Sequence, residues 1–239
     1  MQMSAAMDLI SSNGLSFPDD PEIMTKRLRT LLRKGRYEAS EAHALKAFVG
    51  KGSSVVELGA GIGYISTSAA VHFGARSVTC IEANPRLCDY IRTVHDLNDV
   101  QNSTVINALA MPRSQAETMP ETLPFYVAKP FWSSAMELPK NHESTKIDVP
   151  VVALDQILAD ADADALICDI EGAEATLFDD LDLGPVRFVL VELHTNRIKA
   201  EGVVNVFENM HRHGFFYHQQ ASGEGVVLFK KFRAARPRT

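Results

Sequence analysis

Four residues able to carry acid–base chemistry follow two apolar segments that have the composition of buried strands. Asp169 and Glu171 come directly after one segment, and Glu192 and His194 close the next. In an extended chain, residues two apart point to the same side, so each pair projects together. A crowded carboxylate or imidazole can have its pKa moved toward neutrality and act as a general base. The pattern therefore predicts a catalytic group at these two strand ends.

Other interpretations of the same residues stay open. Carboxylates with one imidazole suit Mg²⁺ or Mn²⁺, but their spacing is not diagnostic of metal ligands, so we assign no metal. In a purely structural alternative, Asp169 caps a helix and Glu192 makes a buried hydrogen bond. We assign Glu174, which also follows the first segment, to the dipole of the next helix.

A second group of residues has the character of a ligand-binding turn. The apolar run 55–58, which includes Glu57, leads directly into Gly59, Gly61 and Gly63. Glycine allows positive φ and close approach of a ligand, and a helix beginning after the turn presents free N–H groups to the same space. The G-x-G-x-G spacing differs from the G-x-G-x-x-G of dinucleotide enzymes, which disfavours NAD.

Two acidic residues indicate which ligand such a turn would hold. Glu82 ends the strand-like run 77–81, and a carboxylate roughly twenty residues after the turn suits binding to ribose hydroxyls. Glu57 lies inside a predicted strand, where a charge needs a partner, either a cationic ligand or backbone N–H groups alone. Because the turn has no basic residue, the pattern favours a cationic nucleoside such as S-adenosylmethionine over a ligand with phosphates.

The composition is that of a globular enzyme. The chain has 239 residues, 46% of them hydrophobic and 23% charged, which is enough for one α/β domain with a filled core. A net charge of −6 argues against nucleic-acid binding by the whole surface, although the residues after 229 are locally basic. The cysteines lack CxxC spacing, and no run has the roughly 18 apolar residues of a membrane span. We expect a cytoplasmic protein that binds neither nucleic acid nor membrane.

Strand-like and helix-like segments alternate from residue 53 to residue 193, and this alternation predicts a parallel sheet with right-handed crossovers. Later runs at 215–218 and 225–229 predict an antiparallel pair. Ligands of parallel sheets bind outside the carboxyl ends of the strands, so Gly59, Glu82 and Asn107 are expected to face one crevice. The expected strands are 55–58, 77–81, 103–107, 165–168 and 186–193.

Two segments lie outside this alternation. We expect residues 1–52 to form a helical cover, with a weak helix or an arm over 1–17, on a domain of residues 53–239, the two making one compact unit. Residues 109–150 hold six of the eleven prolines and are expected to be an irregular connection, of the kind that often binds substrate. Trp132, Ser133 and Ser134 are its substrate-side candidates, unless Trp132 only fills an edge of the core.

The motifs resemble those of the FkbM-type family of S-adenosylmethionine-dependent methyltransferases over residues 35–229. The specific similarity lies in Asp-Ile-Glu-Gly-Ala-Glu at 169–174 and Glu-Leu-His at 192–194. Residues 36–38, 56–63, 81–85 and 105–108 add weaker similarity. The chain departs from the family pattern at Glu57, where aspartate is common, and at Ile167, where lysine is common.

The resemblance implies a Rossmann-like class I methyltransferase fold: a seven-stranded, mostly parallel sheet with an antiparallel final hairpin, flanked by helices. It also implies which residues bind S-adenosylmethionine. Glu82 would bind the ribose hydroxyls, and Asp169 would face the methionine end and the acceptor. The other implied cofactor residues are Glu57, Gly59 and Gly61 in the turn, and Asn107 and Ala108 beside the adenine.

The implied reaction is O-methylation of a small metabolite such as a sugar or a polyketide. We expect His194 to accept the hydroxyl proton, with Asp169 and Glu171 as orienting groups or alternative bases. The alternative function is a protein that binds S-adenosylmethionine or a nucleotide without turnover, which the crowding of like charges disfavours. A homo-oligomer is left open.

Overall fold

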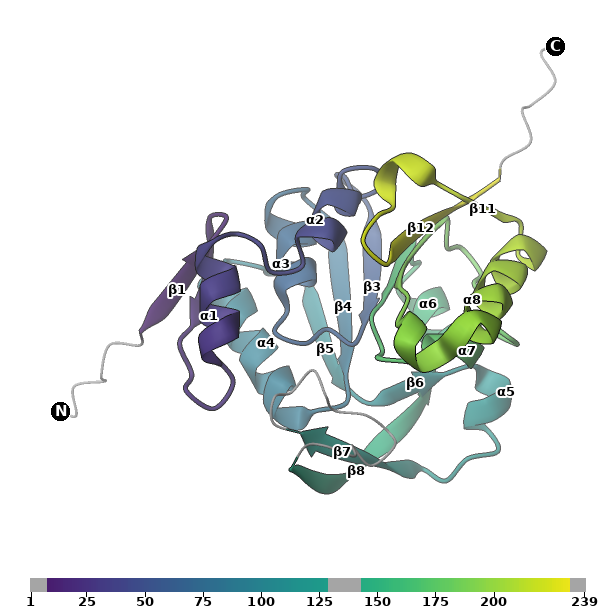
Figure 1. Ribbon diagram of the computed structural model, residues 1–239, viewed down its shortest axis with the longest axis horizontal. Helices are drawn as coiled ribbons and strands as arrows, with labels where there is room; N and C mark the ends of the chain where they lie inside the picture. The colour runs from purple at the N-terminus through teal and green to yellow at the C-terminus, as the bar shows by residue number, and fades with distance from the viewer. Residues whose placement is uncertain (1–7, 129–142, 233–239) are drawn as a thin grey trace, which may run out of the picture.

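The computed structural model describes residues 8–128 and 143–232. Seven strands form one sheet in the order β11-β12-β10-β9-β3-β4-β5 (Figure 1). All neighbours pair in parallel except β12, which is antiparallel to both β10 and β11. The predicted Rossmann-like sheet with an antiparallel final hairpin is confirmed. Its strands are β3 (Ser54–Leu58), β4 (Ser77–Glu82), β5 (Ser103–Asn107), β9 (Ala165–Cys168), β10 (Phe188–Glu192), β11 (Phe215–Tyr217) and β12 (Val226–Lys231).

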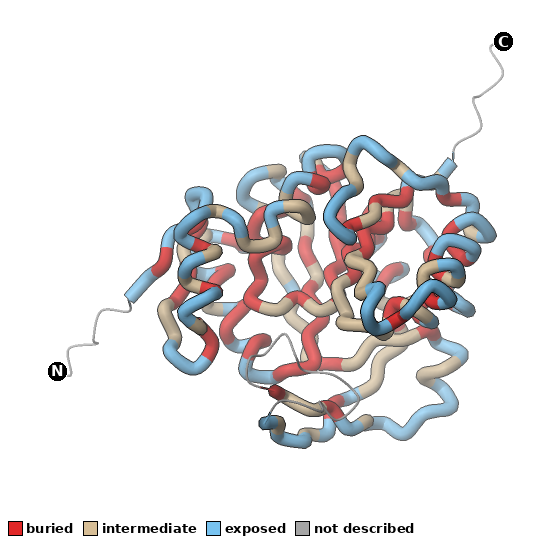
Figure 2. The backbone as a smooth tube through the Cα atoms, in the orientation of Figure 1, coloured by how far each residue is buried: buried red, intermediate tan, exposed pale blue. Residues whose placement is uncertain are grey.

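Helices cover both faces of this sheet because successive strand residues point to opposite sides. Val55 packs into a core with residues of α1 to α4, whereas Val56 faces a second core with α6, α7 and α8. Burying each valine contributes about 1.5–3 kcal/mol. Figure 2 shows the central strands buried between more exposed helices. The helices are α1 (Lys26–Arg33), α2 (Ala39–Leu45), α3 (Tyr64–Val71), α4 (Pro85–Leu97), α5 (Arg113–Ala116), α6 (Leu154–Asp160), α7 (Glu174–Leu177) and α8 (Thr195–Arg212).

The start of the described chain is a hairpin of β1 (Leu9–Ser12) and β2 (Leu15–Pro18). The expected weak helix or arm is therefore wrong for these residues. The turn is Asn13-Gly14, and both residues have positive φ. The two central residues of this tight hairpin turn must adopt left-handed backbone angles. Asn and Gly adopt such angles more readily than other residues, so an Asn-Gly pair favours the turn. Within the segment expected to be a helical cover, α1 and α2 follow this hairpin.

Part of the segment expected to be irregular forms a second, three-stranded sheet in the order β6-β8-β7. Its strands are β6 (Leu109–Met111), β7 (Thr122–Ala128) and β8 (Ser144–Ala153). The expectation of an irregular connection is wrong for these strands. Trp132, Ser133 and Ser134 lie outside the described residues. No helix within the described ranges is long and apolar enough to cross a membrane.

Candidate active site

The glycine turn after β3 lies directly against the end of β9. Gly59 has a φ of +73°, and a Cβ added to it would lie 1.7 Å from the carbonyl oxygen of Asp169. The backbone N–H of Asp169 donates to the carbonyl of Leu58 at 3.0 Å. Only glycine fits this approach, so the turn and the first acidic strand end meet at the carboxyl edge of the sheet.

Glu82 holds the glycine turn from the neighbouring strand end. Its Oε2 accepts the backbone N–H of Gly61 at 3.0 Å, and its Oε1 accepts that of Asn84 at 2.8 Å. Burial raises the pKa of Glu82. The side-chain amide of Asn107 donates to the carbonyls of Glu82 and Ala83, both at 2.9 Å. The expected grouping of the turn, Glu82 and Asn107 is therefore present, and buried Ala108 follows it.

Glu57 is satisfied within the protein. Its Oε2 accepts the backbone N–H of Ser66, in the first turn of α3, at 3.1 Å, and the Cys80 thiol lies 3.8 Å away. A carboxylate at this position pairs with one of the free N–H groups of the helix start. Burial raises the pKa of Glu57 to about 7. These contacts match the alternative in which backbone N–H groups, and not a ligand, offset its charge.

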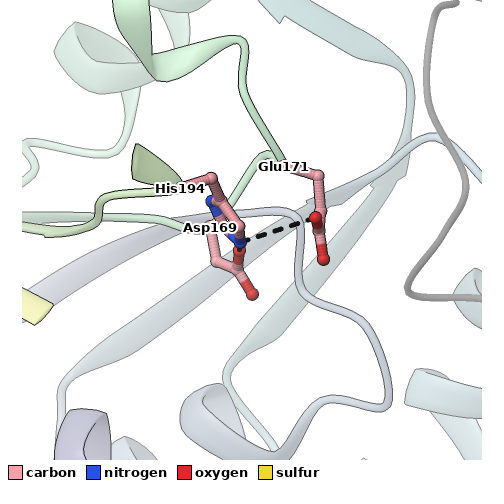
Figure 3. A group of neighbouring side chains, drawn as sticks. All are labelled: Asp169, Glu171 and His194. Atoms are coloured by element: carbon pink, nitrogen blue, oxygen red, sulfur yellow. Dashed lines mark ion pairs between the residues drawn. The ribbon is translucent and has the colours of Figure 1, made fainter. Parts of the chain in front are cut away.

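His194 lies beside Asp169 and Glu171, as Figure 3 shows. Its Nε2 is 3.6 Å from Oδ1 of Asp169 and 3.5 Å from Oε2 of Glu171. Oε1 of Glu192 is 4.0 Å from the same nitrogen. The structure therefore brings together the four groups that were expected to converge, although they come from strand ends that are 20 or more residues apart in the chain.

Glu174 positions both the backbone and the ring of His194. This fully buried carboxylate accepts the backbone N–H of His194 at 2.8 Å, and its Oε1 is 3.1 Å from Nδ1 of the ring. Its other oxygen accepts the N–H of Gly172 at 2.6 Å. The hydrogen bond places a proton on Nδ1 and directs Nε2 toward Asp169 and Glu171. The assignment of Glu174 to the helix dipole missed this role.

The charges around His194 favour its protonated form. Burial alone would lower its pKa, but the hydrogen bond to Glu174 and the charges of Glu171 and Asp169 outweigh burial and raise the pKa to about 9. Burial, with the charge of Glu192, raises the pKa of Asp169 well above its usual value, although His194 opposes this. The raised pKa of His194 favours the protonated imidazole at neutral pH, whereas the raised pKa of Asp169 makes its carboxylate a stronger base.

Arg197 fixes the carboxylate of Glu171. Its Nη2 is 3.0 Å from Oε2, and its Nη1 donates to the carbonyl of Glu171 at 2.8 Å. Glu171 and Gly172 have φ values of +53° and +112°, which turn the chain sharply after β9. Sequence reasoning did not find Arg197, whose only signal is its place three residues after His194.

The segment before β3 adds acidic groups at the same edge of the sheet. Burial raises the pKa of Glu41 of α2 to about 7, and the charge of Glu192 adds to this rise. Burial raises the pKa of Tyr37 and of Glu38, and the charge of Asp169 contributes to both shifts. Sequence reasoning counted residues 36–38 as weak family similarity and Glu41 as part of the helical cover, and it gave none of these residues a role in the site.

The first half of the chain is similar to a known methyltransferase domain. A family model described as the TRM5/TYW2 methyltransferase domain matches residues 35–119. The match includes the glycine turn, Glu82 and Asn107 but ends before Asp169. The matching model is not that of the FkbM-type family.

Several solved structures are similar to this chain in overall fold, at low sequence identity. TYW2 of M. jannaschii in complex with AdoMet is 15% identical, with a TM-score of 0.49, over 97% of this chain and 90% of that chain. Precorrin-6y C5,15-methyltransferase of Geobacter metallireducens GS-15 is 13% identical, with a TM-score of 0.46, over 89% and 91%. Magnesium protoporphyrin IX methyltransferase of Synechocystis PCC 6803 with bound SAM is 11% identical, with a TM-score of 0.48, over 87% and 86%. No curated protein matches the chain.

Proposed function

We propose that the protein is an S-adenosylmethionine-dependent methyltransferase that methylates a hydroxyl group of a small metabolite. The observation that carries the proposal is the contact between Gly59 and Asp169, which sets the cofactor turn against the acid–base group. The order of the seven strands and the family model for residues 35–119 support the methyltransferase part of this function, and not the choice of acceptor.

The turn and Glu82 fit the cofactor. A carboxylate has about four acceptor positions, and the N–H groups of Gly61 and Asn84 use two of those on Glu82. The remaining two suit the paired hydroxyls of a ribose. Asn107 and Ala108, at the next strand end, are the proposed adenine neighbours. The glycine spacing and the lack of a basic residue in the turn disfavour NAD.

The bound cofactor would supply a methyl group on a positively charged sulfur. As the acceptor oxygen bonds to that carbon and the carbon–sulfur bond breaks, the hydroxyl proton must leave. Asp169 takes this proton, with Glu171 as the alternative, because His194 already carries one at neutral pH. His194 then holds the two carboxylates in place. This assignment replaces the expectation that His194 is itself the base.

The charge of the site favours a small acceptor over a nucleic acid. A phosphate backbone approaching this edge would meet like charges, which repel it. Among the described residues, Arg197 is the one arginine or lysine that pairs with an acidic side chain of this edge. The motifs shared with the FkbM-type family point to the same class of acceptor. The acidic side chains at the edge are Glu38, Glu41, Asp169, Glu171 and Glu192.

The test is a screen for formation of S-adenosylhomocysteine from S-adenosylmethionine. One arm contains small alcohols, among them sugars and polyketides, and the other contains total RNA. Turnover that depends on a small alcohol supports the proposal. Turnover with RNA alone would overturn the acceptor class, and binding of the cofactor without any turnover would favour the non-catalytic alternative.

A further inference from the structure

Three side chains at the ends of β9 and β10 direct potential ligand atoms toward one point. The ligand atoms of Asp169, Glu171 and His194 all lie within 4.8 Å of one another. We propose that these residues bind one divalent cation of the Mg²⁺ or Mn²⁺ class. Adjacent ligands on an octahedral ion with bonds of about 2.1 Å are about 3 Å apart. The present separations of 3.5 and 3.6 Å from Nε2 need only a small contraction.

The buried oxygen of Asp169 gives independent support for a cation. Its Oδ1 is hidden from solvent and has no hydrogen-bond partner in the described part of the chain. A buried carboxylate oxygen without a hydrogen-bond donor is unfavourable, and among the described residues only the imidazole of His194, 3.6 Å away, offsets its charge. This oxygen faces Nε2 of His194, and a cation between them would satisfy both atoms.

Neighbouring residues orient the proposed ligands, as the residues that contact metal ligands usually do. The contact from Nδ1 of His194 to Glu174 leaves Nε2 as the coordinating nitrogen, and histidine ligands commonly donate their other N–H to a carboxylate in this way. Arg197 also holds the Glu171 carboxylate, with Nη2 3.0 Å from Oε2. Glu192, at 4.0 Å from Nε2, can provide a further oxygen.

The donor set determines which cation fits. A cation bound at Nε2 would displace the proton from this nitrogen of His194, so that two carboxylates and a neutral imidazole balance a charge of two. Oxygen-rich ligand sets prefer Mg²⁺ or Mn²⁺. The role of the ion rests on the proposed function: it would bind the acceptor oxygen and favour loss of its proton. With Asp169 and Glu171 bound to the ion, Glu192 or water would take this proton in their place. The binding itself does not depend on that function.

The test is a titration of the purified protein with Mn²⁺, without cofactor, followed by the electron paramagnetic resonance signal of free Mn²⁺. The wild type is expected to remove about one Mn²⁺ per chain from the free signal, and Mg²⁺ should release it. Asp169→Asn and His194→Gln should weaken binding by at least about 10-fold. Glu208→Gln, on the exposed side of α8, is the matched control and should bind like the wild type.

Two results would overturn the site. The free signal could persist undiminished with the wild type, or His194→Gln and Asp169→Asn could bind Mn²⁺ as tightly as Glu208→Gln. Binding of S-adenosylhomocysteine by His194→Gln, measured with a chelator present, shows that this variant is folded. Cofactor binding also separates the two proposals. If the protein binds Mn²⁺ but not S-adenosylhomocysteine, the metal site stands and the methyltransferase proposal is wrong.

Discussion

Gly59 and Asp169 touch through their backbones, so that a Cβ on Gly59 would lie 1.7 Å from the carbonyl oxygen of Asp169. The two residues follow neighbouring parallel strands, β3 and β9, whose register pairs Leu58 with Cys168. The glycine turn and the acid–base group are therefore parts of one rigid edge. A change in the turn must therefore displace the backbone of Asp169.

Gly59→Ala should lower both stability and cofactor affinity. The new methyl group would meet backbone, which cannot move aside as a side chain can, and the φ of +73° is itself unfavourable for alanine. Together these effects should reduce the free energy of unfolding by about 2 kcal/mol or more. Gly50→Ala is the control, since its Cβ would meet nothing within 4 Å. Equal stability of both variants in denaturant unfolding would show that the turn and β9 are not in contact.

Glu82→Ala should weaken binding of S-adenosylhomocysteine. Loss of two hydrogen bonds to a ribose removes about 1–3 kcal/mol, which corresponds to a drop in affinity of about 10- to 100-fold. Since Glu82 also accepts two backbone N–H groups, Glu82→Gln should be tested beside it as the better-folded variant. An unchanged dissociation constant for both variants would remove Glu82 from the cofactor site.

The stabilising effect of His194 should disappear at high pH. Its pKa is raised from about 6.5 in the unfolded chain to about 9 in the folded protein, so the folded state binds its proton more tightly. The resulting stability is fully present below pH 6.5 and is lost as the pH rises through 9. Unfolding of the wild type and His194→Gln, measured with a chelator from pH 6 to 10, should show a difference that shrinks by up to about 3 kcal/mol. A constant difference would contradict the raised pKa.

Glu174→Gln should disturb His194 without changing the shape of the site. The amide fills the same space but lacks the charge that favours protonated His194, so the pKa of His194 should fall toward its usual value. Loss of such a partner typically lowers activity or metal affinity by about 10- to 100-fold. Titration of His194 by NMR, with Glu208→Gln as control, measures the first effect. Identical titration curves for the two variants would leave Glu174 with a structural role only.

The strands were predictable because each places apolar residues on two buried faces, and the acidic residues were predictable because they directly follow such runs. The role of Glu174 was not predictable, because it depends on the left-handed turn at Glu171 and Gly172. This turn places the Glu174 carboxylate within hydrogen-bond distance of the His194 backbone. The contact between Glu41 and Glu192 joins residues far apart in the sequence, and periodicity carries no information on such pairs.

The second sheet was missed for a related reason. Strands β7 and β8 contain prolines, including Pro124 and Pro150, which usually indicate irregular structure. The pairing of residues 122–128 with residues 144–150 supplies the hydrogen bonds that define them as strands. The hairpin at residues 9–18 could have been found from its Asn13-Gly14 turn.

Calorimetric titration of the purified protein with S-adenosylhomocysteine, and with NAD in a parallel experiment, tests the methyltransferase assignment most directly. The glycine turn and Glu82 predict saturable binding of S-adenosylhomocysteine by the wild type, with weaker binding by Glu82→Gln and no heat from NAD. Binding of NAD in preference to S-adenosylhomocysteine, or no binding of S-adenosylhomocysteine at all, would contradict the assignment.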